Sequence, residues 1–459
     1  MDEQNKNLLL ATGLSFLVLL IWMAFFAPEP PDDTSVPGDT TVQTDGTAAL
    51  PTAPPAEPDD TGPGSVITPE ETRAAALTDA PRITIDTPRL EGSISLVGGR
   101  IDDLKLKDYR ETLDDGAPIV TLLSPEGAFG AYYAAHGWAH GTGLEPEEVP
   151  GPDTIWTQRA GSALGVNSPV TLSWESPAGL TFEKTISIDD DYMFTIEQSV
   201  ANSTDSEVRL APYGLIRRHG IPEDLKGFFI LHEGLIRMTD GELGEVDYAD
   251  IVDLELADEN TSSSRTMRVA QNGWIGFTDH YWMTTLVPTP GTAFTSTAQM
   301  SDTTGIMQAL TLYPTRTLSP GATETASAQF FAGAKEWEAI RNYQNVGGID
   351  RFLDSIDWGW FFFLTKPIFA VLHWLNAAIG NMGWAIIALT LVIKAVLFPL
   401  AYRSYASMAK MKELQPEMEK LKEAAGDDRD KLQKGMMELY KKNKVNPAAG
   451  CLPILLQIP

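Results

Sequence analysis

Residues 383–402 read GWAIIALTLVIKAVLFPLAY, a run of twenty residues in which Lys394 is the single charge. At about 1.5 Å of rise per residue, such a helix spans roughly 30 Å, the thickness of a hydrocarbon core. Lys394 lies eleven residues beyond Gly383, about 16 Å along that helix. The run therefore predicts a transmembrane helix with a lysine near the middle of the bilayer, and Pro399 is expected to bend or end it.

A lysine at this depth has two interpretations. A charge in the middle of a bilayer costs about 2.5–3.5 kcal/mol on translocon-derived scales, so Lys394 is expected to face water or a partner. It either snorkels to the interface or pairs with a carboxylate and holds a helix bundle together. Alternatively, it is a cation in a wet cavity that attracts carboxylates of a passing chain, by a Coulomb interaction that the low surrounding dielectric strengthens. The residue types leave both interpretations open.

The N-terminal part of the chain predicts a membrane anchor followed by a tether. Residues 8–27, LLLATGLSFLVLLIWMAFFA, are uncharged, which is typical of a membrane helix or a signal sequence. Because Phe25 and Phe26 disturb the small-residue pattern of a cleavage site, residues 1–27 are interpreted as an uncleaved transmembrane anchor. Residues 28–80 are rich in Pro, Asp, Thr and Gly and are predicted to be a disordered acidic linker.

Short β-branched runs dominate residues 81–345. They alternate apolar and polar residues and are separated by clusters of Gly, Pro and Asp. This pattern predicts a mostly antiparallel β-sandwich of about 250 residues. The runs lie at residues 82–86, 170–174, 181–186, 192–196, 274–277 and 307–312. Residues 334–344, AKEWEAIRNYQ, have apolar positions three apart and predict a short helix that leaves the sandwich.

A second apolar segment, residues 358–379, is also long enough to cross a membrane. Residues 403–444 contain eleven Lys or Arg against eight Asp or Glu, so the positive-inside rule places them in the cytoplasm. If the sandwich lies outside, the chain crosses the membrane only once between the sandwich and residue 403. One of the two apolar segments therefore does not cross.

The segment at 358–380 is the weaker candidate for that crossing. Lys366-Pro367 interrupts it, His373 adds polarity, and its tryptophans favour the interface. It is predicted to be an amphipathic helix on the outer leaflet, which leaves residues 383–402 as the second transmembrane helix. The N-terminus is then expected in the cytoplasm, and residues 28 to about 382 outside.

Residues 403–444 predict a cytoplasmic helical hairpin. Apolar residues recur at steps of three and four along its first arm, at Met408, Met411, Leu414 and Met418. Such methionines either bind apolar segments of other chains or, more commonly, form the hairpin's own seam. Pro416 is expected to kink the first arm. Residues 445–459 are uncharged and predict the start of a third transmembrane helix.

Composition and motifs exclude several functions. The chain has a net charge of −28, and because residues 403–444 contribute +3, the remainder has −31, which repels nucleic acid. Cys451 is the one cysteine, so an internal disulfide is impossible. His136 and His140 are four apart, but Gly137 and Gly141 weaken a helix there, so no metal site is predicted. The sequence shows no nucleophile with a matching base and acid, and neither an enzyme nor a cofactor is predicted.

Seven short segments, taken in order, resemble one known family. They are MDEQNKN at 1–7, GWIGFTDHYW at 273–282, GNMGW at 380–384, PL at 399–400, SMAKM at 407–411, LQP at 414–416 and VNPAAGCLP at 445–453. The family is that of the YidC-type membrane protein insertases, bacterial relatives of the mitochondrial and chloroplast insertases. The resemblance implies a membrane protein of the α plus β class. Its parts would be a signal-anchor helix, a large periplasmic β-supersandwich of the galactose-mutarotase type, an interfacial amphipathic helix, a transmembrane helix and a cytoplasmic helical hairpin.

The resemblance also implies a function. The family inserts and folds integral membrane proteins in the bacterial inner membrane, with or without the Sec translocon, by means of a cationic hydrophilic groove. Lys394 matches the single basic residue of that groove, where many members have Arg; lysine keeps the charge but loses the planar fork of a guanidinium. The implied partners are nascent integral membrane proteins, the Sec translocon, the ribosome and the lipid bilayer, and no cofactor is implied.

The resemblance leaves one expectation and two alternatives. Family members continue through further membrane helices, so the chain is expected to be truncated at the start of the third helix. The first alternative is a membrane-tethered periplasmic carbohydrate-binding or epimerase-like protein, because the predicted sandwich resembles carbohydrate-active domains. The second is a scaffold for the Sec translocon that uses only the outer domain.

Overall fold

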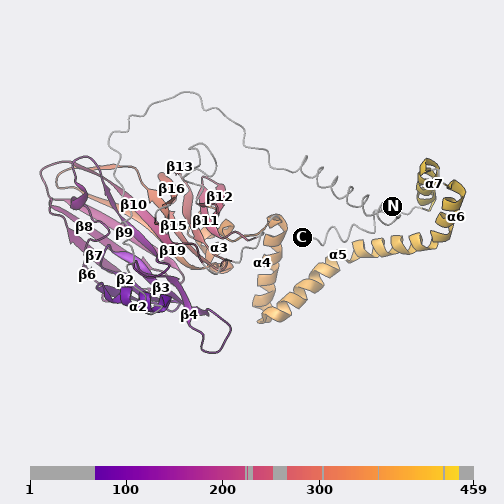
Figure 1. Ribbon diagram of the computed structural model, residues 1–459, viewed down its shortest axis with the longest axis horizontal. Helices are drawn as coiled ribbons and strands as arrows, with labels where there is room; N and C mark the ends of the chain where they lie inside the picture. The colour runs from indigo at the N-terminus through magenta and orange to yellow at the C-terminus, as the bar shows by residue number, and fades with distance from the viewer. Residues whose placement is uncertain are drawn as a thin grey trace, which may run out of the picture. The chain divides into compact units, whose positions relative to one another are not determined.

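The computed structural model describes residues 68–222, 225, 231–251, 266–301, 304–359, 361–426 and 429–443 (Figure 1). All of these residues belong to the unit Ala48–Pro459. The predicted anchor at 1–27, the linker up to residue 67 and the predicted third transmembrane helix at 445–459 lie outside the described residues.

The last part of the predicted linker is a helix, α2 (Pro69–Thr78). Its N-terminus is a capping box, in which the side chains of Thr68 and Glu71 each accept a hydrogen bond from the other residue's backbone N–H. Arg73 of α2 is buried and pairs with Asp103 of the sandwich. The prediction of disorder is therefore wrong for residues 69–78. The helix cap and the contact with the sandwich offset the entropy lost on ordering this segment, which its composition alone would not do.

Two sheets form the sandwich (Figure 1). The strands of the first sheet are β1 (Arg82–Asp86), β2 (Leu90–Ser95), β3 (Arg100–Arg110), β4 (Ile119–Leu123), β5 (Tyr132–His140), β10 (Val208–His219), β13 (Thr266–Val269), β16 (Phe294–Ser301), β17 (Ile306–Leu312) and β18 (Arg316–Leu318). Its order is β1-β2-β3-β5-β10-β17-β16-β13, with β4 beside β3 and β18 beside β10. Its strand pairs are antiparallel.

The second sheet has nine strands, also in antiparallel pairs. They are β6 (Thr157–Ala160), β7 (Val170–Glu175), β8 (Leu180–Ile188), β9 (Met193–Asn202), β11 (Gly234–Thr239), β12 (Glu242–Asp247), β14 (Gly273–Thr278), β15 (Trp282–Pro288) and β19 (Thr323–Ala334). Their order is β12-β11-β14-β15-β19-β9-β8-β7-β6. A 3-10 turn, η1 (Pro146–Glu148), lies between β5 and β6.

The alternation predicted from the sequence is visible in the burial of the strands. Along β8 every second side chain is buried, from Leu180 to Ile188. All six runs predicted as strands overlap an observed strand, and the predicted fold class, a large β-sandwich with helices, is confirmed. One apolar core lies between the sheets, and a second cluster, which includes Tyr213 and Leu215, lies on the opposite side of β10.

The first helical elements after the sandwich are α3 (Trp337–Asn345), the 3-10 turn η3 (Phe352–Ser355), α4 (Phe362–Ile379) and α5 (Met382–Glu413). Gly380 ends α4 with a positive φ of 75°, which glycine adopts without strain. The side chain of Asn381 then caps α5 by accepting a hydrogen bond from the backbone N–H of Trp384. α4 and α5 therefore follow one another after a very short turn.

Neither proline ends its apolar helix. α4 continues through Pro367, and α5 continues through Pro399 as far as Glu413. A proline removes a single backbone hydrogen bond, which a long apolar helix tolerates when neighbouring groups satisfy the freed carbonyl. α5 is therefore longer than the predicted 383–402 and includes the first residues of the predicted hairpin.

The hairpin itself consists of α6 (Gln415–Ala425) and α7 (Arg429–Lys442). Pro416 lies in the first turn of α6, where a missing N–H removes no hydrogen bond. The predicted kink inside one helix is therefore wrong. Instead, the chain passes from α5 to α6 through Leu414, which ends one helix and precedes the other.

Candidate functional site

Lys394 is the thirteenth residue of α5 and its side chain is exposed. Its neighbours one turn away, Leu391 and Phe398, are 66% and 65% exposed. Within the part of the chain that the structure describes, Lys394 makes neither an ion pair nor a hydrogen bond. Among the described residues, therefore, no carboxylate pairs with Lys394 to hold a helix bundle together, which was one of the two interpretations of this lysine.

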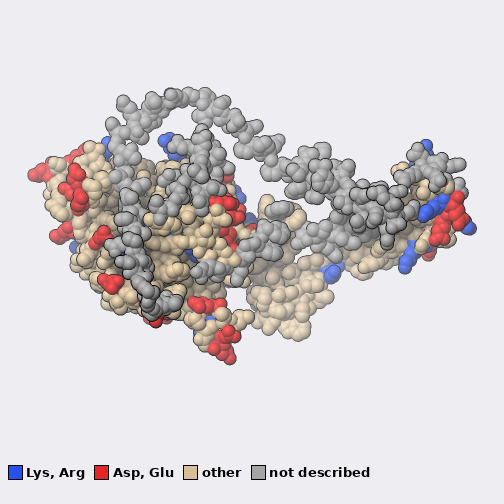
Figure 2. Space-filling model, viewed as in Figure 1, with Lys and Arg blue, Asp and Glu red and all other residues tan. Residues whose placement is uncertain are grey.

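The surface around Lys394 is apolar. Exposed side chains on α5 include Trp384, Ile386, Ile387, Leu391, Val392, Val396 and Phe398. Among the described residues, α4 and α5 are the two helices long and apolar enough to cross a bilayer. Figure 2 shows that their visible surfaces carry few charges. An apolar surface of this size is unfavourable in water and suits hydrocarbon.

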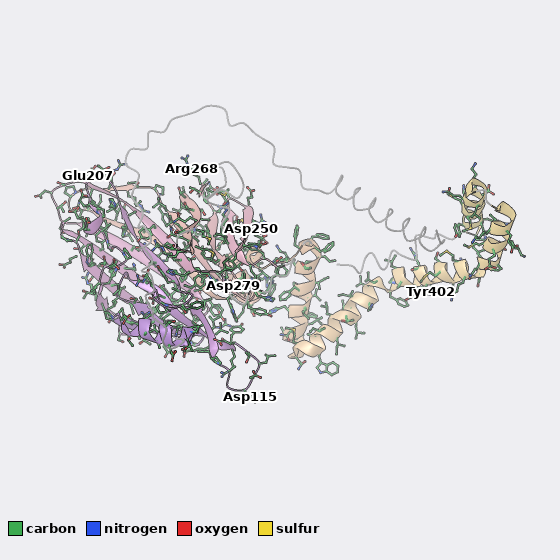
Figure 3. All side chains as sticks on the ribbon, in the orientation of Figure 1. Asp115, Glu207, Asp250, Arg268, Asp279 and Tyr402 are labelled. Atoms are coloured by element: carbon green, nitrogen blue, oxygen red, sulfur yellow. The ribbon has the colours of Figure 1, made fainter. Side chains whose placement is uncertain are left out.

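The end of that apolar surface is marked by aromatic and basic residues. Tyr402, labelled in Figure 3, and Tyr405 are both exposed on α5. Arg403, Lys410 and Lys412 lie beside them on the same helix. Tyrosines followed by cations are typical of the boundary between hydrocarbon and the cytoplasmic head groups.

The four apolar residues predicted on the hairpin lie in different environments. Leu414 is 8% exposed and packs against Leu439 of α7, with Met411 and Met418 beside them. The Tyr440 hydroxyl also contacts the Met418 sulfur at 3.8 Å. Met408, by contrast, is 38% exposed. Three of the four side chains thus occupy the seam of the hairpin, and Met408 offers its surface to other molecules.

One face of α4 contacts the helices that leave the sandwich. Lys366 forms an ion pair with Asp354 of η3. The Trp337 ring of α3 lies 5.7 Å from the Phe369 ring and 4.7 Å from the His373 ring. Because Lys366, Phe369 and His373 follow one another at helical spacing, they form a single stripe along α4. This stripe fixes α4 to the folded domain.

The GWIGFTDHYW segment joins the sandwich to the same junction. Trp274 of β14 donates through Nε1 to the Asp350 carbonyl at 3.0 Å, and its ring lies edge-on to Phe352 of η3. Asp279, labelled in Figure 3, accepts hydrogen bonds from Arg218 and from the Tyr248 hydroxyl. The segment therefore supports the structure that precedes the membrane helices.

A partly buried lysine adds to the polar part of this junction. Lys335, between β19 and α3, donates to the Thr278 hydroxyl at 2.9 Å. Burial lowers the pKa of Lys335 to about 8, although nearby carboxylates, Asp279 first among them, oppose that effect. Lys335 is a structural group at the base of α3 and lies far along the chain from Lys394.

The two histidines considered for a metal lie on a strand. His136 and His140 are both in β5, where residues four apart lie about 13 Å apart. His136 points into the core toward Phe330, and burial lowers its pKa to about 3, so its imidazole is neutral. In the described part of the chain, no group of three or more His, Cys, Asp or Glu residues is placed to hold a metal ion.

Comparison with known proteins assigns a family to the sandwich and another to the helices at the end of the chain. Residues 82–371 match the family described as the YidC periplasmic domain, and residues 374–459 match the 60Kd inner membrane protein family. The membrane protein insertase YidC of Roseobacter denitrificans is 59% identical over 459 residues, which is all of this chain and 75% of that protein. The chain belongs to the YidC family of membrane protein insertases. The YidC proteins of Ruegeria sp. (strain TM1040) and Dinoroseobacter shibae are 60% and 57% identical, again over all of this chain and 75% of each relative.

The solved structures that match the chain are much less similar to it. A galactose mutarotase related enzyme from Lactobacillus acidophilus is 10% identical, with a TM-score of 0.35 over 55% of this chain and 97% of that one. A galactose mutarotase-like protein from Lactobacillus casei is 13% identical, with the same TM-score, over 55% of this chain and all of that one.

The family membership confirms the main predictions made from the sequence. The chain is an inner-membrane protein of an insertase family, not an enzyme, and the epimerase-like alternative is not favoured. Sequence reasoning missed the junction between the sandwich and α4. The GWIGFTDHYW segment was the available signal, since one tryptophan lies in each of two neighbouring strands and Asp279 lies between these strands. The partner of Trp274, however, is 76 residues away.

Proposed function

We propose that this chain promotes the insertion of nascent membrane proteins by presenting Lys394 to them within the membrane. The YidC family acts on nascent membrane proteins in the inner membrane. The observation that supports a role for Lys394 is its exposure on an apolar helix with neither an ion pair nor a hydrogen bond among the described residues.

The proposed step requires no covalent chemistry. A polar outer tail crosses the hydrocarbon at a large cost, because its backbone and charges lose water. A cation in a hydrated groove attracts acidic residues of that tail, and the low dielectric around the groove strengthens the attraction. Once the apolar segment reaches lipid, the hydrophobic effect completes the insertion. Lys394 thus holds the acidic residues only transiently.

The proposed topology places α4 on the outer leaflet and α5 across the membrane. Length and composition allow either helix to cross. The contacts of Lys366, Phe369 and His373 support the interfacial position, because a helix held along two turns by a folded water-soluble domain remains at the surface with it. Among the described residues α5 shows no such contacts with the sandwich, and it is then the single crossing between the periplasmic sandwich and the cytoplasmic hairpin.

The remaining partners follow from this topology. The α6–α7 hairpin lies on the cytoplasmic side, where a ribosome delivers nascent chains, and Met408 offers an exposed apolar contact. We assign contact with the Sec translocon to the periplasmic sandwich. The Met411, Leu414 and Met418 side chains support the hairpin instead of contacting substrate, since they pack at its seam.

The function is tested by insertion of two matched substrates. The two differ only in their outer tail, which has either Asp and Glu or Asn and Gln at the same positions. Lys394→Ala should reduce insertion of the acidic-tailed substrate about tenfold or more, the scale of a lost charged hydrogen bond, while the neutral-tailed substrate inserts nearly as before. Protease accessibility of the tail measures both.

Two further variants complete that test. Lys394→Arg should retain insertion because it keeps the cation. Lys410→Ala removes a lysine from the cytoplasmic end of the same helix and should affect both substrates equally. The role of Lys394 would be disproved if Lys394→Ala impaired the two substrates to the same extent.

A further inference from the structure

The sandwich contains a small pocket beside strands β5 and β10. Its walls include Arg100, Tyr133, Trp156, Tyr213 and Arg217, and residues 150–152 close one side. The cavity measures about 20 Å³. Since one water needs about 10–15 Å³ on this measure, the pocket has room for a group of only a few atoms. We name this cavity the Arg100 pocket.

Two of the residues that line this pocket have hydrogen-bond donors without acceptors. Trp156 is 3% exposed, and its Nε1 has no hydrogen-bond partner among the described residues; the same is true of Arg100 Nε. The guanidinium of Arg100 lies over the Tyr133 ring at 5.5 Å. Burying an N–H group without an acceptor costs about 1–3 kcal/mol. The walls therefore favour a ligand that only accepts hydrogen bonds.

The Glu126 carboxylate accepts hydrogen bonds from two of the residues that line the pocket. Glu126 accepts from Arg100 at 2.7 Å and from the Tyr133 hydroxyl at 3.2 Å. Asp102 approaches Arg100 Nε only to 4.0 Å and is paired with Arg82 instead. Arg217 on the opposite wall donates through Nε to the Gln308 side chain at 2.7 Å. Glu126 thus leaves the donors of Trp156 and Arg100 Nε unsatisfied.

A second cation lies directly behind Trp156. Lys184 occupies an inward position of β8 and is 1% exposed, and its Nζ lies 4.7 Å from the centre of the Trp156 ring. Its one hydrogen bond among the described residues, to the Gly99 carbonyl, is long at 3.4 Å. Burial lowers the pKa of Lys184 to about 7, and no nearby carboxylate opposes that effect.

Lys184 and Trp156 both pack against Gly99. A Cβ placed on Gly99 would lie 3.0 Å from Lys184 Nζ and 3.1 Å from Trp156 Nε1, so any side chain larger than that of glycine would press on both nitrogens. Gly99 has a positive φ of 60°, which a glycine adopts readily, and its backbone closely approaches both side chains. The Lys184 ammonium thus lies behind the Trp156 wall of the pocket, 4.7 Å from the centre of the indole ring.

We propose that the Arg100 pocket binds a carboxylate group, contributed by an acidic peptide or by a small organic acid. A carboxylate only accepts hydrogen bonds, so it matches the unsatisfied donors of Trp156 and Arg100, and its charge compensates Lys184. It is flat and small enough for a cavity of about 20 Å³, whereas a tetrahedral phosphate is bulkier and has additional oxygens to satisfy. The local excess of cations also offsets the repulsion of anions by a chain with a net charge of −28.

The proposal is tested on the intact membrane-embedded protein labelled with 5-fluorotryptophan. The ¹⁹F signal that disappears in Trp156→Phe reports on the pocket. We expect this signal to shift saturably with sodium acetate at constant ionic strength. An N-acetylated Gly-Glu-Gly amide, compared with its Gly-Gln-Gly counterpart, distinguishes the two sources. Saturation by the acidic peptide identifies an acidic segment, and saturation by acetate alone identifies a small acid.

Substitutions decide whether the named groups are responsible. Arg100→Gln should weaken acetate binding about tenfold or more. Lys184→Met should also weaken it, and serves as the deciding variant if Arg100→Gln unfolds. Arg159→Gln, which removes an exposed arginine paired with Glu183, is the matched control and should bind acetate normally. The proposal would be overturned by an unresponsive Trp156 signal, by equal shifts with chloride, or by unchanged binding in Lys184→Met.

Discussion

The Trp337 ring on α3 and the His373 ring on α4 lie 4.7 Å apart, measured between their centroids. Trp337 also contacts Phe369, and Lys366 at the start of the same stripe is paired with Asp354. The ion pair is partly exposed and contributes little by itself, whereas the aromatic contacts remove apolar surface from water. Trp337 is therefore the main point at which the outer domain holds α4.

Replacing Trp337 with Ala should release α4 from α3 without unfolding the sandwich. Truncating an aromatic side chain in a full core typically lowers the free energy of unfolding by about 3 kcal/mol or more, and by somewhat less at a partly exposed junction such as this one. We expect faster proteolytic cleavage within residues 346–361, which connect the two helices, and little change in the thermal unfolding of the sandwich. Trp374→Ala is the control, because Trp374 is on α4 but 67% exposed. Equal cleavage in the two variants would contradict the assigned role of Trp337.

Much of the fold could be predicted because its elements obey local rules. Alternation marks β8, and a long apolar run marks α5. The errors occurred where a tertiary contact outweighs composition or where the position of a proline decides its effect. α2 is ordered by its cap and by the Arg73–Asp103 pair, and Pro416 begins α6 instead of kinking a helix.

The candidate site was predictable only in part. Lys394 is conspicuous in the sequence because a charge interrupts an apolar run, and Leu414 follows a helical period. The contact between Trp337 and His373 joins residues on two different helices, and no periodicity encodes it. Lys184 violates the alternation of its own strand, since it occupies a position where the pattern requires an apolar residue. Only the packed structure reveals that its ammonium lies against Trp156.

Lys184 should make the stability of the outer domain depend on pH. Its pKa is about 7 in the folded protein against an ordinary value of 10.5. Between these values the unfolded chain binds one more proton, so the free energy of unfolding rises with pH by up to about 1.4 kcal/mol per pH unit. This gain in the free energy of unfolding is complete above the ordinary pKa of 10.5 and is lost as the pH falls through about 7. His136 does not titrate in this window, because its pKa is about 3.

The test compares Lys184→Met with the unsubstituted protein in carboxylate-free buffer. Lys184→Met should be more stable near pH 7, because it removes a buried charge, and its stability should vary less between pH 7 and 10. Chemical unfolding of the outer domain, followed by near-ultraviolet circular dichroism, measures both. Lys105→Met changes a partly exposed lysine on β3 and should keep the original pH dependence. An identical pH dependence in all three proteins would rule out the buried-cation explanation.

The hairpin should respond differently to two apolar substitutions. Leu414→Ala removes a buried side chain that packs on Leu439, so α6 and α7 should separate more often and their amide hydrogens should exchange faster. Met408→Ala removes an exposed side chain and should leave exchange in α6 and α7 unchanged. If Met408 contacts nascent chains, a photoreactive residue at position 408 should crosslink to them more than one at position 414. Slow exchange in Leu414→Ala would show that the seam does not hold the hairpin together.

Chemical labelling should distinguish the proposed positions of α4 and α5. With Cys451 replaced by Ser, a single cysteine at Trp374 or at Val392 reports on one helix each. An outer-leaflet α4 with position 374 near the head groups should react with a membrane-impermeant maleimide added from the periplasmic side. Position 392, about 15 Å into a crossing α5, should be protected by hydrocarbon. Unfolding the protein in detergent provides the control, since both cysteines should then react. Protection of position 374 in intact membranes, with labelling only after solubilisation, would show that α4 is buried in the bilayer, and the single crossing between sandwich and hairpin would have to be abandoned.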